Sequence, residues 1–179
     1  GASELFAVKP DMMTLGKIVG GGLPLAAYAG RREIMEMVSP LGGVYQAGTL
    51  SGNPMATAAG LAQLDLLEQE KPWAELALQG SRLAQGLCDA AATARVPVQV
   101  NQIGSMITVF FSDKPVIDTE TAMAANASTF ARFFHGMLER GIYLPPSQYE
   151  SAFISTMHND IILNQIIEKA SEVFSIIGK

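Results

Sequence analysis

Residues 14–24 read TLGKIVGGGLP, and this stretch decides the fold because it ends one apolar run and leads into another. The first run covers residues 12–15 and the second covers residues 26–30. Continuous apolarity, without alternation, is typical of strands that a parallel sheet buries on both faces. We therefore expect two buried strands of an α/β fold, joined by a glycine-rich turn.

Lys17 is the first candidate for chemistry, because it is the single charged residue between Leu15 and Ala29. Apolar surroundings disfavour the ammonium form and favour the neutral amine, which is the nucleophilic form. The glycines at 20–22 have no Cβ, so a bulky planar group could approach the main chain closely. A solvated loop lysine beside a structural turn is the alternative that these residues leave open.

The composition limits the protein classes that need to be considered. The chain has 179 residues, of which 49% are hydrophobic and 16% charged, so a sizeable core can form and disorder is excluded. Its net charge of −5 argues against a nucleic-acid partner, and no apolar stretch reaches the roughly 18 residues of a membrane span. The single cysteine and the absence of His/Cys clusters fit a reducing compartment without a metal site. We expect a cytoplasmic protein.

Hydrophobic spacing and turn residues predict the remaining elements. Helices are expected at residues 31–38, 54–69, 73–94, 126–140 and 159–177, and further strands at 105–111 and 142–144, with 145–155 as a loop or broken strand. Asn53 before Pro54 marks a helix start. The final helix is expected to bury Ile162, Ile166, Ala170 and Phe174. The predicted domain boundary follows Pro72, which gives domains 1–72 and 73–179.

Three segments together carry a family resemblance. Residues 14–24 resemble the lysine segment of the class III, fold type I pyridoxal-phosphate enzymes. Residues 45–54, YQAGTLSGNP, are similar to a second signature of the aminomutase branch of that family. Residues 145–153, PPSQYESAF, followed by Ser155 and His158, are similar to the C-terminal substrate segment of the same branch. The resemblance spans nearly all of the chain, and the segments occur in the order that the family has.

The resemblance implies a role for five residues. Lys17 would bind pyridoxal 5'-phosphate covalently and, once free, transfer protons; the cofactor would alternate with its pyridoxamine 5'-phosphate form. Gly48 and Thr49 would bind the cofactor phosphate of the neighbouring subunit, in a homodimer formed through loop 42–53. Tyr45 and Glu150 would line the substrate pocket. Without the resemblance, Gly48 and Thr49 also fit a glycine-rich connector. Tyr45 also fits a packed loop aromatic, and Glu150 an exposed loop carboxylate.

The resemblance also implies a fold and an activity. Residues 1–72 would be the end of the large, mainly parallel-sheet cofactor domain, and residues 73–179 a small α+β C-terminal domain. The complete enzyme would be an isomerase that converts glutamate-1-semialdehyde to 5-aminolevulinate in tetrapyrrole (porphyrin) biosynthesis. The pair Tyr149-Glu150 favours this intramolecular transfer. A class III ω-aminotransferase and a non-catalytic dimerisation fragment are the alternatives.

Parts of the family's site are missing from the sequence. The chain lacks the aspartate that would hold the pyridine nitrogen protonated, the phosphate-binding glycine/serine turn and the aromatic residue that would stack on the ring. It also begins at Gly1 without a methionine. We therefore expect a C-terminal fragment that does not turn over alone.

Other polar and sulfur-bearing residues are expected to be structural. Cys88 reads as a small core residue, and His135 and His158 read as structural rather than as bases. The methionines Met35, Met37 and Met55 are expected to fill core or interface. The loop charges Asp113, Asp118 and Glu120 are expected to be solvated.

Overall fold

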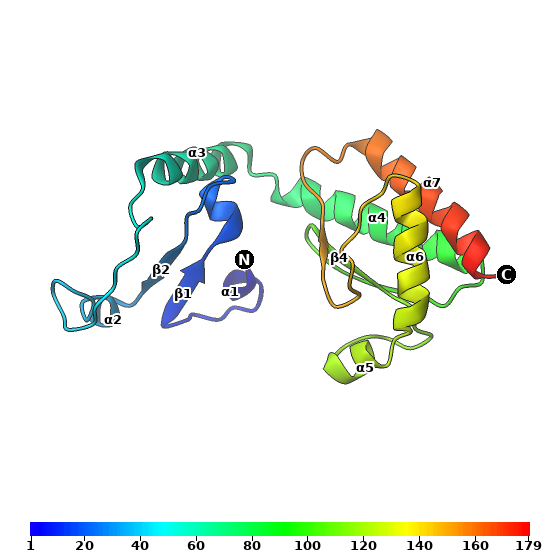
Figure 1. Cartoon of the computed structure of the whole chain (residues 1–179), viewed down its shortest axis with the longest axis horizontal. Coiled ribbons are helices and arrows are strands. Elements are labelled where there is room, and N and C mark those ends of the chain that lie inside the picture. The colour runs from blue at the N-terminus through cyan, green and yellow to red at the C-terminus, as the bar shows by residue number, and fades with distance from the viewer. The chain divides into compact units, whose positions relative to one another are not determined.

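The computed structural model describes residues 1–179 and divides after Lys71 into two units, each with its own sheet (Figure 1). Unit 1 is Gly1–Lys71 and unit 2 is Pro72–Lys179. No helix in either unit has both the length and the apolar character that crossing a membrane requires.

Unit 1 contains a two-stranded sheet and a long helix. Its elements are α1 (Ala2–Leu5), β1 (Met12–Leu15), the 3-10 helix η1 (Lys17–Gly20), β2 (Ala27–Gly30), α2 (Arg32–Met35) and α3 (Pro54–Glu70). The two strands occur where the sequence predicts them, but they pair antiparallel, with Met12 opposite Gly30. Every residue of both strands is exposed, so the expectation of a buried parallel pair is wrong for this unit. Apolar composition alone does not bury a strand that no other element of its unit covers.

Helix α3 begins as predicted. The Asn53 side chain accepts hydrogen bonds from the main-chain N–H groups of Met55 and Ala56, both at 3.1 Å, and Pro54 occupies the first helical position. These contacts satisfy two of the donors that a helix start leaves free.

The glycines after Lys17 hold η1 against α3. Gly21 has a φ of +57°, and a Cβ on it would lie 2.9 Å from the carbonyl oxygen of Ala59. A Cβ on Gly60 would lie 3.0 Å from the carbonyl oxygen of Val19. The close packing of the two helices therefore needs glycine on both sides.

Helix α2 is shorter than the predicted helix at 31–38. The N–H of Met37 bonds to the carbonyl of Ile34, and the N–H of Val38 bonds to the carbonyl of Met35. Each bond reaches back three residues, as in a turn, and not four as in an α-helix. Val38 then forms an isolated bridge with Val44, which takes the chain away from helical geometry.

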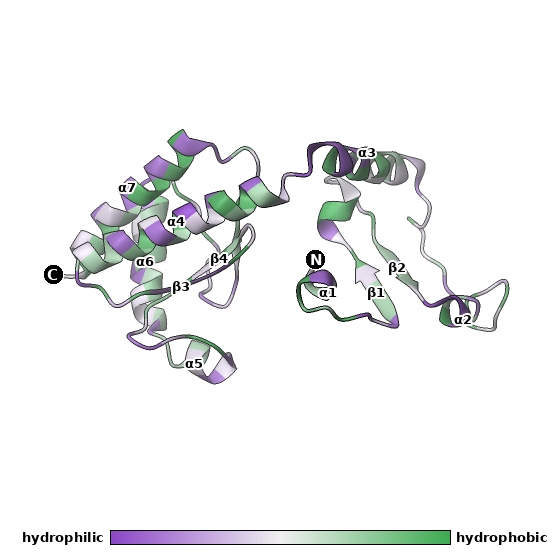
Figure 2. Cartoon of the chain, turned by 180° about the vertical axis from the view of Figure 1, so that it is seen from behind, coloured by the Kyte–Doolittle hydropathy of each residue, from purple (hydrophilic) through white to green (hydrophobic).

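Unit 2 packs three long helices with a three-stranded antiparallel sheet of order β3-β4-β5. Its elements are α4 (Trp73–Thr93), β3 (Gln99–Ile103), β4 (Met106–Phe110), α5 (Thr119–Met123), α6 (Ala127–Glu139), β5 (Ala152–Phe153) and α7 (Asp160–Ile177). Helix α4 contacts α7 and β3, and α6 contacts α7. Figure 2 shows hydrophilic and hydrophobic residues interleaved along α4 and α7, as expected of amphipathic helices.

The core of unit 2 is built on aromatic side chains. Phe133 of α6 stacks on Phe174 of α7 with ring centroids 4.8 Å apart, and Phe111 meets Phe133 edge-on at 5.6 Å. Met137 and Leu163 are fully buried beside them. The buried stripe of α7 is Leu163, Ala170, Val173 and Phe174. The prediction was right for Ala170 and Phe174. Ile166 is half-buried and packs at the edge of the core, whereas Ile162 is exposed, so the prediction was wrong for Ile162.

Three details of unit 2 differ from the prediction. Strand β3 was not expected; Gly104, at a φ of +56°, opens the two-residue turn that pairs β3 with β4. Helix α5 was not expected either, and Asp118, predicted to be a solvated charge, caps it by accepting from the Thr121 N–H at 2.8 Å. The predicted strand at 142–144 is absent, because the Ile142 N–H bonds to the Met137 carbonyl and ends α6.

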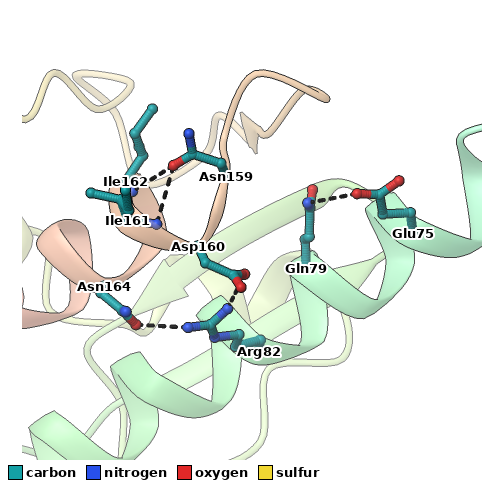
Figure 3. A network of polar contacts seen from close by, with 8 residues as sticks. All are labelled: Glu75, Gln79, Arg82, Asn159, Asp160, Ile161, Ile162 and Asn164. Carbon is teal, nitrogen blue, oxygen red and sulfur yellow. Dashed lines mark hydrogen bonds and ion pairs between the residues drawn. The ribbon is translucent and has the colours of Figure 1, made fainter.

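A polar network joins α4 to the first turn of α7 (Figure 3). Arg82 donates to Asp160 and, at 2.8 Å, to Oδ1 of Asn164. The Asn159 side chain caps α7 by accepting from the N–H groups of Ile161 and Ile162, both at 3.1 Å. Arg82 therefore fixes the position of the start of α7 along α4.

Candidate functional site

Lys17 lies one residue, Gly16, after the end of the predicted strand and occupies the first position of η1. Gly16 before it is extended, whereas Lys17 itself has a φ of +55°, in the left-handed region that side-chain-bearing residues rarely occupy. Such a strained main chain is common at functional positions. The Lys17 ammonium group makes no ion pair or hydrogen bond within the chain, so its position does not come from a charged partner.

The apolar neighbours of Lys17 are exposed together with it. Leu15 and Ile18, on either side, are 45% and 68% exposed. The sequence therefore predicts the apolar character of the segment correctly, but unit 1 does not bury the lysine. Desolvation that favours a neutral amine needs a covering surface from outside this unit.

Loop 42–53 presents polar main-chain and hydroxyl groups just before α3. The N–H of Ser51 bonds to the carbonyl of Gly48 at 2.9 Å and that of Asn53 to Leu50 at 3.1 Å, which makes two successive turns. A Cβ on Gly48 would lie 2.9 Å from Oγ of Ser51, so glycine suits this turn. Thr49 and Tyr45 are exposed, Tyr45 at 84%. No hydrogen bond or ion pair joins this loop to Lys17.

Glu150 lies in unit 2, in a loop that we call the Glu150 loop, residues 145–151. Its carboxylate makes no ion pair with another residue of the chain. Glu150 lines a mainly apolar cavity of about 270 Å³ while it remains exposed, so it lies where the cavity opens to solvent. Thr108, Tyr143 and His158 are the other polar residues in the wall.

His158 has the structural position that the sequence predicts. Its Nδ1 accepts from the main-chain N–H of Ser155 at 3.0 Å, which closes the turn before α7. A neutral ring therefore carries its proton on Nε2. Cys88 is half-buried, and this burial raises the pKa of its thiol. Met37 and Met55 are exposed and Met35 is half-buried, so they do not fill the core of unit 1, and the predicted interface role stays a prediction.

Sequence reasoning missed Gln148. This residue is 2% exposed and is the one buried polar residue of the chain. Its buried Oε1 has no hydrogen-bond partner. The signal for it was weak, because a glutamine between a serine and a tyrosine in a loop ordinarily faces solvent.

Comparison with known families identifies the chain. The model of the family "Aminotransferase class-III" matches residues 2–177. The chain belongs to the class-III aminotransferase family. The family resemblance inferred from the three sequence segments is therefore confirmed.

The curated class-III relatives with high identity share one name. Proteins named "Glutamate-1-semialdehyde 2,1-aminomutase" from Persephonella marina and from a strain of Thermus thermophilus are 52% and 56% identical over 174 and 169 residues. The alignments cover 97% and 94% of this chain, and 41% and 40% of those proteins. The chain therefore spans about two-fifths of the length of the relatives that it matches.

Solved class-III structures agree on the fold. An omega-transaminase from Sphaerobacter thermophilus superposes with a TM-score of 0.85 at 25% identity, over 99% of this chain and 41% of that one. A glutamate-1-semialdehyde-aminomutase from Pseudomonas aeruginosa PAO1 in complex with PMP gives 0.81 at 20% identity, over 97% and 40%. The predicted fold class, part of the α/β fold of class-III aminotransferases, is confirmed.

Proposed function

We propose that this chain is part of an enzyme that moves an amino group within one substrate, converting glutamate-1-semialdehyde to 5-aminolevulinate for tetrapyrrole biosynthesis. The observation that supports this activity is the identity of more than half of the aligned residues with proteins of that name from several organisms. We further propose that residues 1–72 belong to the cofactor domain and residues 73–179 to a small C-terminal domain.

The proposed cofactor is pyridoxal 5'-phosphate, which alternates with pyridoxamine 5'-phosphate. The donor set of unit 1 fits it: Lys17 offers an amine without an internal partner, and Thr49 offers an exposed hydroxyl beside the Gly48 turn. Lys17 would bind the aldehyde carbon, and Gly48 and Thr49 would bind the phosphate. When bound, the cofactor withdraws electrons from the substrate carbon that carries the amino group.

Lys17 is proposed to move protons as well as to hold the cofactor. A single amine at the end of β1 can take a proton from one substrate carbon and return it to another. The positive φ at Lys17 and the contact of Gly21 with α3 fix the direction in which the chain leaves the strand. Covering the exposed apolar neighbours would disfavour the ammonium form and keep the amine reactive.

We propose a homodimer in which loop 42–53 reaches the cofactor of the other subunit. The exposed apolar side chains of this part of unit 1 support an interface here, since a stable protein rarely leaves so many in contact with water. They include Leu41, Val44, Tyr45, Leu50 and Met55. Class-III aminotransferases are generally dimeric, which agrees with this proposal.

Glu150 and Tyr45 are proposed to bind the substrate. The Glu150 carboxylate has no cationic partner within the chain and lies at the opening of a mainly apolar cavity. An ammonium group arriving with the substrate would supply that partner, and a partly desolvated pair is stronger than one in bulk water.

Two other functions have some support. The similarity to a solved omega-transaminase supports a class III ω-aminotransferase, which uses separate amino donors and acceptors. The two-fifths coverage of the relatives supports a non-catalytic dimerisation fragment.

The test uses a full-length protein that carries this chain. Glutamate-1-semialdehyde is supplied without an amino acceptor, and formation of 5-aminolevulinate is expected. Lys17→Ala should abolish it, because one group holds the cofactor and moves the protons. Lys9→Ala, an exposed lysine in the same unit, should not change turnover. Product that forms only after 2-oxoglutarate is added would favour the aminotransferase, and near-parent turnover by Lys17→Ala would remove Lys17 from the mechanism.

A further inference from the structure

The Glu150 loop has little main-chain support of its own. Pro145 and Pro146 have no N–H to donate, and the one main-chain bond within residues 145–150 runs from the Glu150 N–H to the Ser147 carbonyl at 3.1 Å. The Tyr149 N–H bonds to Oγ of Ser147 at 3.2 Å. Since these bonds stay inside the loop, they shape it but do not fix it to the rest of unit 2.

Side chains on either side of Glu150 make the connections to unit 2. On one side, Nε2 of Gln148 donates to the carbonyl oxygen of Ala122, in α5, at 3.4 Å. On the other side, Oγ of Ser151 lies 3.0 Å from Oγ1 of Thr108, in β4. Glu150 therefore lies between two anchors that come from different elements.

The hydrogen bond of Gln148 ends on a residue that packs against the core. Ala122 packs on a small core cluster formed by Phe110, Val116 and Ala125. Helix α5 is itself fixed by the mutual hydrogen bonds of Asp118 and Thr121. The acceptor of the Gln148 hydrogen bond is therefore a residue whose own position is held by packing.

Packing alone does not explain a glutamine at position 148. A buried amide oxygen without a partner is unfavourable, and an apolar side chain of similar volume, such as methionine, would fill the space without it. The amide also provides a directional hydrogen bond to the Ala122 carbonyl, which holds the loop in one position relative to α5.

We propose that Gln148 is a positioning residue that holds Glu150 at the opening of the cavity and thereby sets the affinity for the ammonium group of the substrate. This proposal rests on the proposed function for the identity of the substrate. The anchoring itself follows from the contacts of Gln148 alone.

The kinetic test compares Gln148→Met with the parent in the full-length holoenzyme. We expect the KM for glutamate-1-semialdehyde to rise about tenfold with a smaller change in kcat, since the lost contact binds substrate in ground and transition states alike. Gln79→Met is the matched control, because Gln79 also has a buried Oε1 without a partner but lies on α4. It should leave KM unchanged.

A double-mutant cycle separates positioning from a merely structural role. In a Glu150→Gln background, Gln148→Met should change KM by less than about twofold, because the group that it positions is already gone. An effect as large as in the parent background, or no effect of Gln148→Met on the parent, overturns the proposal. So does failure of Gln148→Met to fold when Gln79→Met folds, since Gln148 would then support the whole unit.

Hydrogen exchange tests the anchoring without any substrate. A peptide covering residues 145–151 should exchange faster in Gln148→Met than in the parent, while a peptide from α7 keeps its rate. Unchanged exchange in 145–151 overturns the anchoring. If the parent makes no 5-aminolevulinate but the exchange still accelerates, the proposed function fails and the positioning of Glu150 stands.

Discussion

Arg140 at the end of α6 and Glu172 of α7 form an ion pair in which Nε of Arg140 lies 2.8 Å from Oε2 of Glu172. Lys169 lies 2.8 Å from the other carboxylate oxygen, and Arg140 also donates to the Gly136 carbonyl at 2.9 Å. One carboxylate thus joins the two helices that carry the stacked core aromatics.

This pair predicts a pH dependence of stability. The hydrogen bond from Lys169, and then the one from Arg140, lower the pKa of Glu172 below its ordinary value of 4.5. A lowered pKa in the folded state means that the stabilisation is complete above 4.5 and is lost as the pH falls through the folded-state pKa. In urea unfolding of the full-length protein, Glu172→Gln should have a lower free energy of unfolding than the parent at neutral pH. Its free energy of unfolding should also fall less than that of the parent when the pH is lowered. Glu168→Gln, on the same helix without an ion pair, should follow the parent. Parallel pH profiles of Glu172→Gln and the parent would contradict the prediction.

Gly80→Ala should destabilise unit 2. A Cβ at this position of α4 would overlap the carbonyl oxygen of Gly104 in the β3–β4 turn and would lie 3.0 Å from Nε2 of Gln102. We expect a loss of about 1–3 kcal/mol in the free energy of unfolding from overpacking, although alanine is the better helix former by about 1 kcal/mol. Gly86→Ala is the comparison on the same helix, since its Cβ would meet side-chain atoms of Ile167 and no main-chain atom, so we expect a smaller loss. Equal losses for both variants would refute the backbone clash.

Phe133→Ala should be among the most damaging core substitutions. Phe133 is 1% exposed and contacts both Phe111, which follows β4, and Phe174 of α7, so truncation leaves a cavity inside the core. A loss of about 3–5 kcal/mol is expected in chemical unfolding. Leu78→Ala, an exposed apolar residue of α4, should cost less than about 0.5 kcal/mol. A loss below about 2 kcal/mol for Phe133→Ala, by the same scale, would mean that the core can collapse around it.

Mixing an inactive variant, Lys17→Ala, with a weakened one, Thr49→Val, tests the proposed dimer. Thr49→Val keeps the side-chain shape but loses a hydrogen bond to a charged acceptor, worth about 1.5–3 kcal/mol, or roughly 10–100-fold in activity. In a heterodimer with Lys17→Ala, both lesions fall in one site and the other site is whole. Recovered activity is therefore expected after the variants are mixed under exchange conditions. If the mixture is no more active than its components, Thr49 acts in its own subunit or not at all.

Glu150→Gln separates an aminomutase from an aminotransferase. In the proposed reaction the semialdehyde receives a second amino group and becomes a diamine before 5-aminolevulinate forms. Loss of the carboxylate should weaken retention of this diamine, which carries an ammonium group, so that diamine appears in solution and 5-aminolevulinate formation falls. Chromatographic measurement of both compounds over the first turnovers is the assay. Glu139→Gln, an exposed carboxylate of α6, serves as the control. If Glu150→Gln forms 5-aminolevulinate at the parent rate and releases no diamine, Glu150 is an exposed loop carboxylate without a role in binding.

The long helices could be predicted because their signals are local. Asn53, Asn126 and Asn159 each accept from main-chain N–H groups within three residues, so the cap and the helix start are adjacent in the sequence. Strand β3 could not be recognised in the same way, because its polar residues pair with β4 across a turn and the sheet is settled only by that pairing. The segment 142–144 has strand-like composition, but the N–H of Ile142 bonds to the Met137 carbonyl at the end of α6 and is not free to pair with a strand.

The candidate site was predictable to the same extent. The position of Lys17 after a strand follows from its neighbours, whereas its exposure depends on which surfaces cover unit 1, and no spacing rule contains that information. Gln148 could not be predicted, since its burial depends on Ala122, which is 26 residues away in the sequence.

The packing of Gly21 on Ala59 has a mechanical consequence. Because these two backbones are already in contact, η1 cannot move toward α3, and a lateral shift of α3 must carry η1 with it. Lys17 is the first residue of η1. A partner that displaced α3, for example by binding at the exposed Leu61 and Leu64, would therefore also displace the main chain that carries Lys17.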